Sequence, residues 1–210
     1  MANVLAPNGF TVVRRLDGAA WTGNMTQYLI KSGNTNSIFA GDPVARTTLS
    51  SASGGYIDQC QPALLQTQGP LGIFVGVRNA NTSTIASPWA AAYLGSSTAD
   101  TVCYVIDDPF VVMRCWVGTG SSATAGGPAA QADIGLNFNY SYGTGGNTTS
   151  GVSSAYLNYV TKASTNTLPF TLLGLVSQPP GINGYDTTTA GNIVEVTWNQ
   201  QAFRVGNTGV

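Results

Sequence analysis

The chain has 210 residues, of which 43% are hydrophobic and only 8% are charged, with eight basic and nine acidic side chains and no histidine. This length is enough for one all-β domain or two small ones with a substantial core. Low charge together with long apolar runs excludes a disordered chain, and a net charge of −1 without a basic block argues against a nucleic-acid partner.

The same composition has consequences for partners and location. A solitary soluble domain normally carries charges of both signs densely over its surface, so a chain this poor in charge is expected to cover much of its surface with partners. No apolar run reaches the length of a membrane span, so no membrane partner is expected. The opening residues, MANVLAPNGF, lack the charged and apolar regions of a signal peptide, and use without export is expected.

Residues 1–35 are expected to form an N-terminal arm followed by the first strands. A turn signal at Ala6 to Gly9 precedes a strand pattern over Phe10 to Leu16, and Tyr28 to Ile30 reads as another strand. An extended arm of this length can cross a neighbouring subunit. The alternative is that these residues add an edge strand to their own sheet.

Residues 36–210 are expected to form the body, and its centre is the stretch Thr101 to Gly118. Two apolar runs there flank the polar turn Asp107-Asp108-Pro109. Because proline fixes its own φ and restricts the residue before it, the chain must bend at this turn. The stretch is either a hairpin or two successive core strands with a corner between them. Both faces of the second run are apolar, which places it deep in the protein.

Further strand patterns lie on both sides of this centre, and no amphipathic helix is evident. The glycine-rich residues 118–128 read as a surface loop and as a possible internal boundary. The clearest half-buried pattern is Leu136, Phe138 and Tyr140, and in Ile193 to Trp198 Glu195 faces away from its valine neighbours. The chain is therefore predicted to be all-β, an antiparallel sandwich or barrel of about nine to eleven short strands with an extended N-terminal arm.

Candidate chemistry is scarce. Without histidine, the Ser-His-Asp and Cys-His nucleophile systems are excluded, and Asp107-Asp108 is interpreted as a turn former. The three cysteines, Cys60, Cys103 and Cys115, lack metal-ligand spacing and are interpreted as buried small hydrophobes. A Cys103–Cys115 bridge is conceivable, but a reducing cytoplasm disfavours it. No enzyme activity, metal or cofactor is expected.

Aromatic residues outside the core runs are a further group of interest, because aromatic side chains are enriched at interfaces. Tyr140, Tyr142 and Tyr156 are the candidates for an oligomer interface. Trp21, Trp89 and Tyr159 also lie outside the core runs and could line a binding surface. The alternative for each is an inward-facing position on an ordinary strand.

The order of several motifs resembles a group of small head-associated virion proteins of tailed bacteriophages. The Met-Ala-Asn opening leads to a Pro-x-Gly-Phe turn and a Gly/Trp-containing loop, and the later matches follow in the same order: Gly41-Asp42-Pro43-Val44, Gly72 to Val77, Val105 to Pro109, Asp133 to Asn137, Leu173-Gly174-Leu175 and Ile193 to Asn199. Members of this group often close on Asn-Asn-His, whereas Asn199-Gln200-Gln201 stands here.

This resemblance implies a capsid decoration, or cement, protein on the outer surface of the virion. Its partners would be the major capsid protein and further copies of itself, in a trimer in preference to a dimer. The residues expected to contact the capsid are Phe10, Arg14, Arg15 and Trp21, because two arginines and two aromatics have the composition of an interface. Local packing is the alternative for these four.

A different class of function is a glycan-binding receptor or a head- or tail-fibre module. The Asn/Ser/Thr/Gly-rich loops and scattered aromatics suit sugar recognition. That interpretation predicts a shallow cleft with an exposed Trp or Tyr.

Overall fold

A computed structural model of the chain describes residues 3, 6–47, 55–62, 69–78, 89–120, 124–143, 145–176 and 186–204. Within these ranges the regular structure consists of fifteen β-strands and one 3₁₀ turn, Gln131–Asp133. Eleven strands have three residues or more and four have only two. The all-β prediction is confirmed, and the two-residue strands account for the excess over nine to eleven.

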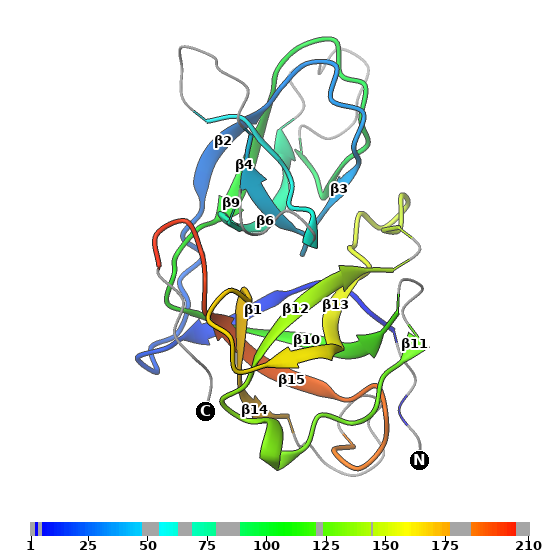
Figure 1. Ribbon diagram of the computed structural model, residues 1–210. Coiled ribbons are helices and arrows are strands. Elements are labelled where there is room, and N and C mark those ends of the chain that lie inside the picture. Colours follow the sequence, from blue (N-terminus) through cyan, green and yellow to red (C-terminus); the bar gives the residue numbers. More distant parts are fainter. Residues whose placement is uncertain are drawn as a thin grey trace.

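Figure 1 shows two lobes, one above the other. The lower lobe is a seven-stranded sheet: β1 (Thr11–Arg15), β10 (Val111–Thr119), β11 (Thr124–Ala125), β12 (Asn137–Tyr142), β13 (Ala155–Ala163), β14 (Phe170–Leu175) and β15 (Ile193–Trp198). Its order is β1-β10-β13-β12-β14-β15, and β15 also pairs with β10, so the sheet closes into a barrel. Every pairing in it is antiparallel except β10 with β13.

The upper lobe holds the remaining strands: β2 (Thr26–Ile30), β3 (Ile38–Phe39), β4 (Pro43–Arg46), β5 (Ile57–Gln59), β6 (Gly72–Arg78), β7 (Trp89–Ala90), β8 (Ala92–Tyr93) and β9 (Thr101–Ile106). Its main sheet runs β2-β9-β6-β4-β5, with β7 on β6, and β3 and β8 form a separate pair. One bridge between Leu29 and Tyr56 connects the two ends of the main sheet.

The central stretch passes from one lobe to the other. β9 belongs to the upper sheet and β10 to the lower barrel, and the two strands pair with different partners. The hairpin interpretation of Thr101 to Gly118 is therefore wrong, and the alternative of two core strands with a corner holds. The physical reason is that Pro109 and its neighbours turn the chain out of one sheet and into the next.

Of the expected arm, residues 1, 2, 4 and 5 lie outside the described residues, and residues 6–35 remain within the molecule. β1 pairs with β10 of its own barrel, from Thr11 opposite Arg114 to Arg15 opposite Val111. The next strand, β2, pairs with β9 in the upper lobe. The division into 1–35 and 36–210 does not describe this arrangement, because the upper lobe is inserted between β1 and β10 of the lower one.

Of the glycine-rich residues 118–128, residues 121–123 lie outside the described part, and the residues on either side are paired as strands. β10 extends through Gly118 and Thr119, which pair with Ala125 and Thr124 of β11. Composition alone did not predict this pairing. No internal boundary of the two lobes falls here.

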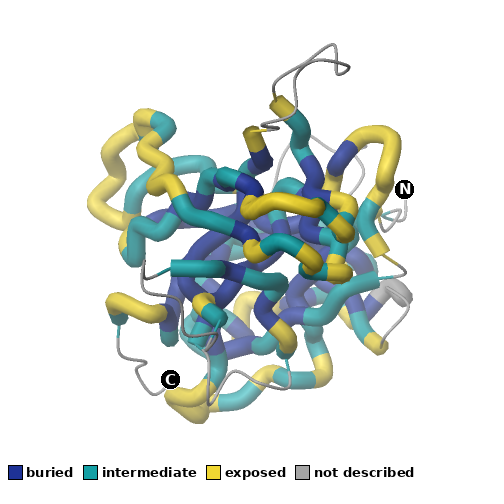
Figure 2. The backbone as a smooth tube through the Cα atoms, turned by 90° about the horizontal axis from the view of Figure 1, so that it is seen from above, coloured by how far each residue is buried: buried dark blue, intermediate teal, exposed yellow. Residues whose placement is uncertain are grey.

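Two clusters of buried side chains form the cores, and Figure 2 shows the buried backbone at the centre with exposed turns around it. On β15 the expected alternation holds, because Val194 and Val196 are fully buried while Glu195 faces outward. The lower core contains a stack of rings in which Phe170 lies 4.4 Å from Phe10 and 4.7 Å from Trp198, measured between centroids. Such stacks stabilise beyond the area they bury.

Candidate functional site

The four predicted contact residues lie in four different environments. Phe10 is only 2% exposed and stacks at 12° on Phe170 in the lower core. Its assignment to a contact surface is corrected, because its ring occupies the centre of the barrel. Trp21 is half-buried against the same core and lines a cleft of about 360 Å³ at the boundary of the lobes.

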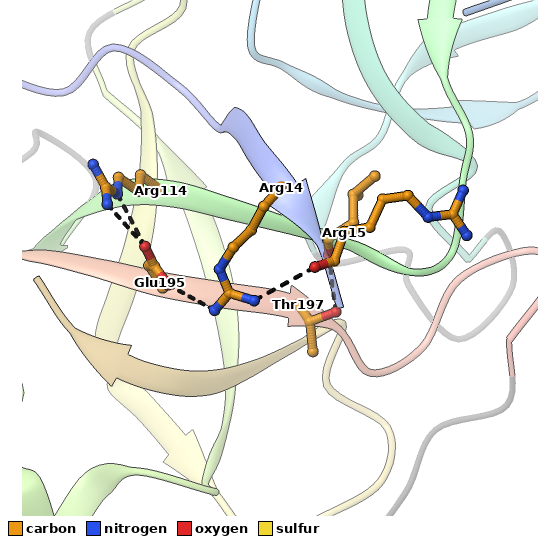
Figure 3. A network of polar contacts seen from close by, with 6 residues as sticks. Arg14, Arg15, Arg114, Glu195 and Thr197 are labelled. Carbon is orange, nitrogen blue, oxygen red and sulfur yellow. Dashed lines mark hydrogen bonds and ion pairs between the residues drawn. The ribbon is translucent and has the colours of Figure 1, made fainter. Parts of the chain in front are cut away.

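Arg14 takes part in an ion-pair cluster across three strands of the barrel (Figure 3). Glu195 on β15 accepts hydrogen bonds from Arg14 Nη2 at 3.0 Å and from Arg114 Nε and Nη2 at 3.1 and 3.0 Å. Both arginine side chains remain more than one-third exposed. One carboxylate between two guanidinium groups leaves a net positive charge on this face of the barrel.

Arg15 lies at the point where the chain crosses between the lobes. Its Nη1 is 3.1 Å from Asp108 and its Nε is 3.5 Å from Asp17. The Arg15 charge is therefore neutralised within the protein. The Asp108 carboxylate also accepts the backbone N–H of Phe110 at 2.8 Å, which supports its interpretation as a turn former.

The tyrosines proposed for an oligomer interface are internal. Tyr140 and Tyr156 are fully buried, and the Tyr140 hydroxyl donates to the Cys60 carbonyl at 2.5 Å. The Tyr142 hydroxyl lies 3.0 Å from the carbonyls of both Pro43 and Cys60. The oligomer-interface assignment is corrected for all three, because Tyr156 is fully buried with its hydroxyl on the Thr119 and Gly120 carbonyls, and the other two hydroxyls join β12 to the upper lobe.

A buried carboxylate holds the same boundary at another point. Asp42 is 1% exposed and accepts hydrogen bonds from Ser153 Oγ at 2.5 Å, the Phe39 amide at 2.9 Å and Gln59 Nε2 at 3.3 Å. Burial raises its pKa to about 6, against the lowering effect of these donors. Since Ser153 belongs to the lower lobe, this carboxylate connects the two lobes.

Two facing glycines allow the backbones to cross beside Asp42. Gly9 and Gly41 both have positive φ, at 77° and 95°, and the Phe10 amide donates to the Gly41 carbonyl at 3.0 Å. A Cβ atom on Gly9 would lie 2.7 Å from that carbonyl oxygen. Two of the motifs that carry the phage resemblance, the Pro-x-Gly-Phe turn and Gly41 to Val44, thus meet at one structural joint.

The most exposed aromatic surface was not predicted from the sequence. Phe110 and Phe203 are 50% and 56% exposed, and Leu16, whose amide donates to the Phe110 carbonyl, is 38% exposed. The guanidinium carbons of Arg204 and Arg46 lie 5.8 and 5.7 Å from the ring centroids of Phe110 and Phe203, respectively. We call these five residues the aromatic–arginine patch.

The patch brings together segments that are distant in sequence. Phe110 follows the corner between the lobes, Phe203 and Arg204 follow β15, Arg46 ends β4 and Leu16 follows β1. No single stretch of the sequence contains more than two of these residues. Only the crossing of the lobes places them side by side.

A second exposed aromatic lies on the upper lobe. Trp89 is 42% exposed, and its ring centroid lies 5.4 Å from that of Tyr104 at an interplanar angle of 42°. The Trp89 ring covers Gly76, where an added Cβ would come within 2.5 Å of it. The missing side chain at Gly76 therefore lets the indole lie flat on the strand.

The cysteines behave as small hydrophobes. All three are buried and none forms a disulfide. Cys103 belongs to the upper core and Cys115 to the lower one, so a bridge between them is excluded in this fold. Burial raises the pKa of Cys60 to about 11 and that of Cys103 to about 12, which keeps these thiols protonated and weakly reactive.

The described parts of the chain contain no group of three or more His, Cys, Asp or Glu side chains that could hold a metal ion. Among the same residues, no helix has the length and apolar character needed to cross a membrane. Comparisons with protein-family models, with curated proteins and with solved structures found no match.

Proposed function

We propose that this is a structural virion protein that binds the outside of an assembled phage capsid and stabilises it by bridging neighbouring capsid subunits. The aromatic–arginine patch is the observation that carries the proposal. Phe110 and Phe203 expose half or more of their surface, and arginine guanidinium groups lie over both rings. Aromatic residues and arginine dominate the energetically important parts of protein interfaces.

The sequence supports the same proposal in two further ways. The ordered motifs resemble those of phage head decoration proteins, and the joint between Gly9 and Gly41 gives two of them a shared structural role. The charged fraction of 8% is about one-third of the ~25% usual for soluble domains. A surface with few charges loses little solvation when partners cover it.

The mechanism is mass action. A protein that binds only the expanded shell stabilises that shell by its binding free energy, and many copies act together. Copies held in an oligomer release more slowly, because each attached copy raises the effective concentration of the others. The two lobes suit such a bridge, since hydrogen bonds donated to Asp42 by Ser153, and by the hydroxyls of Tyr140 and Tyr142, hold them together.

The test is sedimentation of the purified protein with expanded capsids, unexpanded capsids and disassembled capsid protein. We expect the protein to sediment with expanded capsids, and a Phe110→Ala/Phe203→Ala variant to bind roughly tenfold or more weakly. The matched control is Val160→Ala, which truncates a side chain that is 69% exposed on β13. The proposal fails if the wild-type protein sediments with none of the three.

One observation favours a second candidate, a glycan-binding receptor or fibre module. The exposed Trp89 ring beside Tyr104 offers a flat aromatic surface on which a sugar ring can stack. Binding of host polysaccharide by the wild-type protein, lost on Trp89→Ala and accompanied by no binding to capsids, would replace the first proposal with this one. If the Trp89 ring serves only to cover the backbone of Gly76, the wild-type protein is expected to bind no polysaccharide.

A further inference from the structure

We infer that the aromatic–arginine patch recognises an acidic protein surface, one that presents Asp or Glu carboxylates beside apolar side chains. This inference names the partner chemistry of the site on which the proposed function rests. The protein neutralises some of the charges around the patch with its own side chains and leaves others without an ion pair.

The first step concerns the arginines of the patch. In the described part of the chain, Arg14, Arg15 and Arg114 each have a carboxylate within 3.1 Å. No carboxylate lies within ion-pair distance of Arg46 or Arg204 in the same described part. The patch therefore carries two cations that the protein itself does not neutralise.

The second step concerns the acidic groups nearby, which are already occupied. Asp108 and Asp17 both pair with Arg15. Asp107 accepts hydrogen bonds from the hydroxyls of Thr26 at 2.9 Å and Tyr28 at 2.8 Å. Tyr28 also contacts Arg46, whose guanidinium carbon is 6.0 Å from the ring centroid. These contacts engage the acids, and none of the acids forms an ion pair with Arg46 or Arg204 among the described residues.

The third step concerns how the two guanidinium groups are held. Arg204 donates from Nη1 to the Pro109 carbonyl at 3.2 Å while its guanidinium carbon stays near the Phe110 ring. Arg46 lies between the rings of Tyr28 and Phe203. Ring contacts fix both groups in place, so little side-chain entropy is lost when a carboxylate binds.

The apolar part of the partner follows from the rings themselves. Leu16, Phe110 and Phe203 expose between 38% and 56% of their surface around the two cations. A purely anionic ligand would leave these surfaces in water. A protein segment with carboxylates and apolar side chains next to one another satisfies both halves of the patch.

The test uses a probe that does not depend on capsids. A short peptide in which Glu alternates with Leu is titrated into the full-length protein and followed by NMR, with the Gln–Leu peptide as the neutral control. We expect the Glu–Leu peptide to shift the resonances of Phe110 and Phe203, with binding that weakens as salt rises. The Gln–Leu peptide is expected to bind roughly tenfold or more weakly.

Matched variants identify the residues responsible. An Arg46→Gln/Arg204→Gln variant is expected to lose most of the preference for the acidic peptide, and Arg46→Lys/Arg204→Lys to retain part of it. Arg78→Gln removes an exposed cation on β6 and is expected to change nothing. Equal binding of both peptides by the wild-type protein, or binding of neither, overturns the inference.

The same variants separate this inference from the proposed function. If the wild-type protein and the glutamine variant sediment equally with expanded capsids, the proposed function stands and the acidic partner is wrong. If the acidic peptide binds at the patch but capsids do not, the inference stands and the capsid is not the partner.

Discussion

The two lobes are built from similar strands but have unequal cores. The lower core contains the stack of Phe10, Phe170 and Trp198, and it extends upward to include Cys60 and Ile106 from the other lobe. The upper core is smaller and mainly aliphatic, with Phe74 as its largest fully buried ring. The difference indicates that the lower lobe has the more stable core, and that the upper lobe depends on this core for part of its hydrophobic burial.

The largest expected effect tests this dependence directly. Phe170→Ala removes the middle ring of the stack and is expected to cost about 3–5 kcal/mol of unfolding free energy. Phe74→Ala is the matched substitution, since both side chains are fully buried. We expect Phe170→Ala to accelerate amide hydrogen exchange in both lobes, and Phe74→Ala to accelerate it mainly in β6 and β9.

A different pattern of hydrogen exchange would contradict the dependence of the upper lobe on the lower one. Protection of β6 and β9 that survives Phe170→Ala unchanged would show that the upper lobe folds independently. In that case the shared part of the lower core would contribute little to the upper lobe.

The second prediction concerns the carboxylate that connects the lobes. The pKa of Asp42 is about 6 in the folded protein and close to 3.8 in an unfolded chain. Between these values the folded state binds more protons, so stability falls as pH rises through this window and levels off above about pH 7. The full effect corresponds to roughly 3 kcal/mol.

Thermal unfolding measured from pH 4 to pH 7 checks this slope, with Asp42→Asn as the control that cannot titrate. Hydrogen bonds to Asp100, Asp133 and Asp186 hold the pKa values of these carboxylates below their usual range, so they add a small slope of the opposite sign near pH 4 and little above about pH 5. We expect the wild-type protein to lose stability across the window and the variant to show a nearly flat profile. A wild-type profile as flat as that of Asp42→Asn would show that Asp42 does not carry the pH dependence.

The third prediction compares two glycines that differ only in their surroundings. Both Gly9 and Gly18 have positive φ, at 77° and 87°. A Cβ on Gly9 would lie 2.7 Å from the Gly41 oxygen and 2.8 Å from Ser153 Cβ, whereas Gly18 has open space around it. Gly18→Ala is expected to cost about 1 kcal/mol from its backbone conformation alone, and Gly9→Ala about 2 kcal/mol more from overpacking.

Chemical denaturation of the two variants provides the measurement. Equal losses would mean that the crossing between the lobes adjusts without cost. The joint would then be looser than the close approach of Gly9 and Gly41 indicates.

The contrast between the lobes also explains what the sequence could and could not predict. The alternation in β15 and the apolar runs in β10 predicted strands correctly, because side-chain periodicity is a local property. The partner of each strand is not local. The apolar runs of β9 and β10, with a turn between them, have the composition expected of a hairpin. In the structure the corner at Pro109 directs the two strands into different sheets.

The same limit applies to the candidate site. Phe10 and Phe110 are both aromatics beside turn residues, yet one is 2% exposed and the other 50%. The patch joins residues from four segments, so no window of sequence contains it. That Arg46 and Arg204 form no ion pair with a carboxylate of the described residues is likewise a property of the folded chain.

The smallest expected effect concerns the hydroxyls that tie β12 to the upper lobe. The Tyr142 hydroxyl has one proton to donate and two carbonyls, Pro43 and Cys60, at 3.0 Å. Tyr142→Phe keeps the ring and leaves those carbonyls without that donor, so we expect a loss of about 1 kcal/mol. Tyr159→Phe is the control, because its hydroxyl lies at the surface, beside the ion pair of Lys162 and Asp133, and its expected change is within about 0.5 kcal/mol. If urea denaturation gave the two variants equal stability, the buried hydroxyl would add nothing to the boundary, and the attachment of the upper lobe would rest on apolar packing and Asp42.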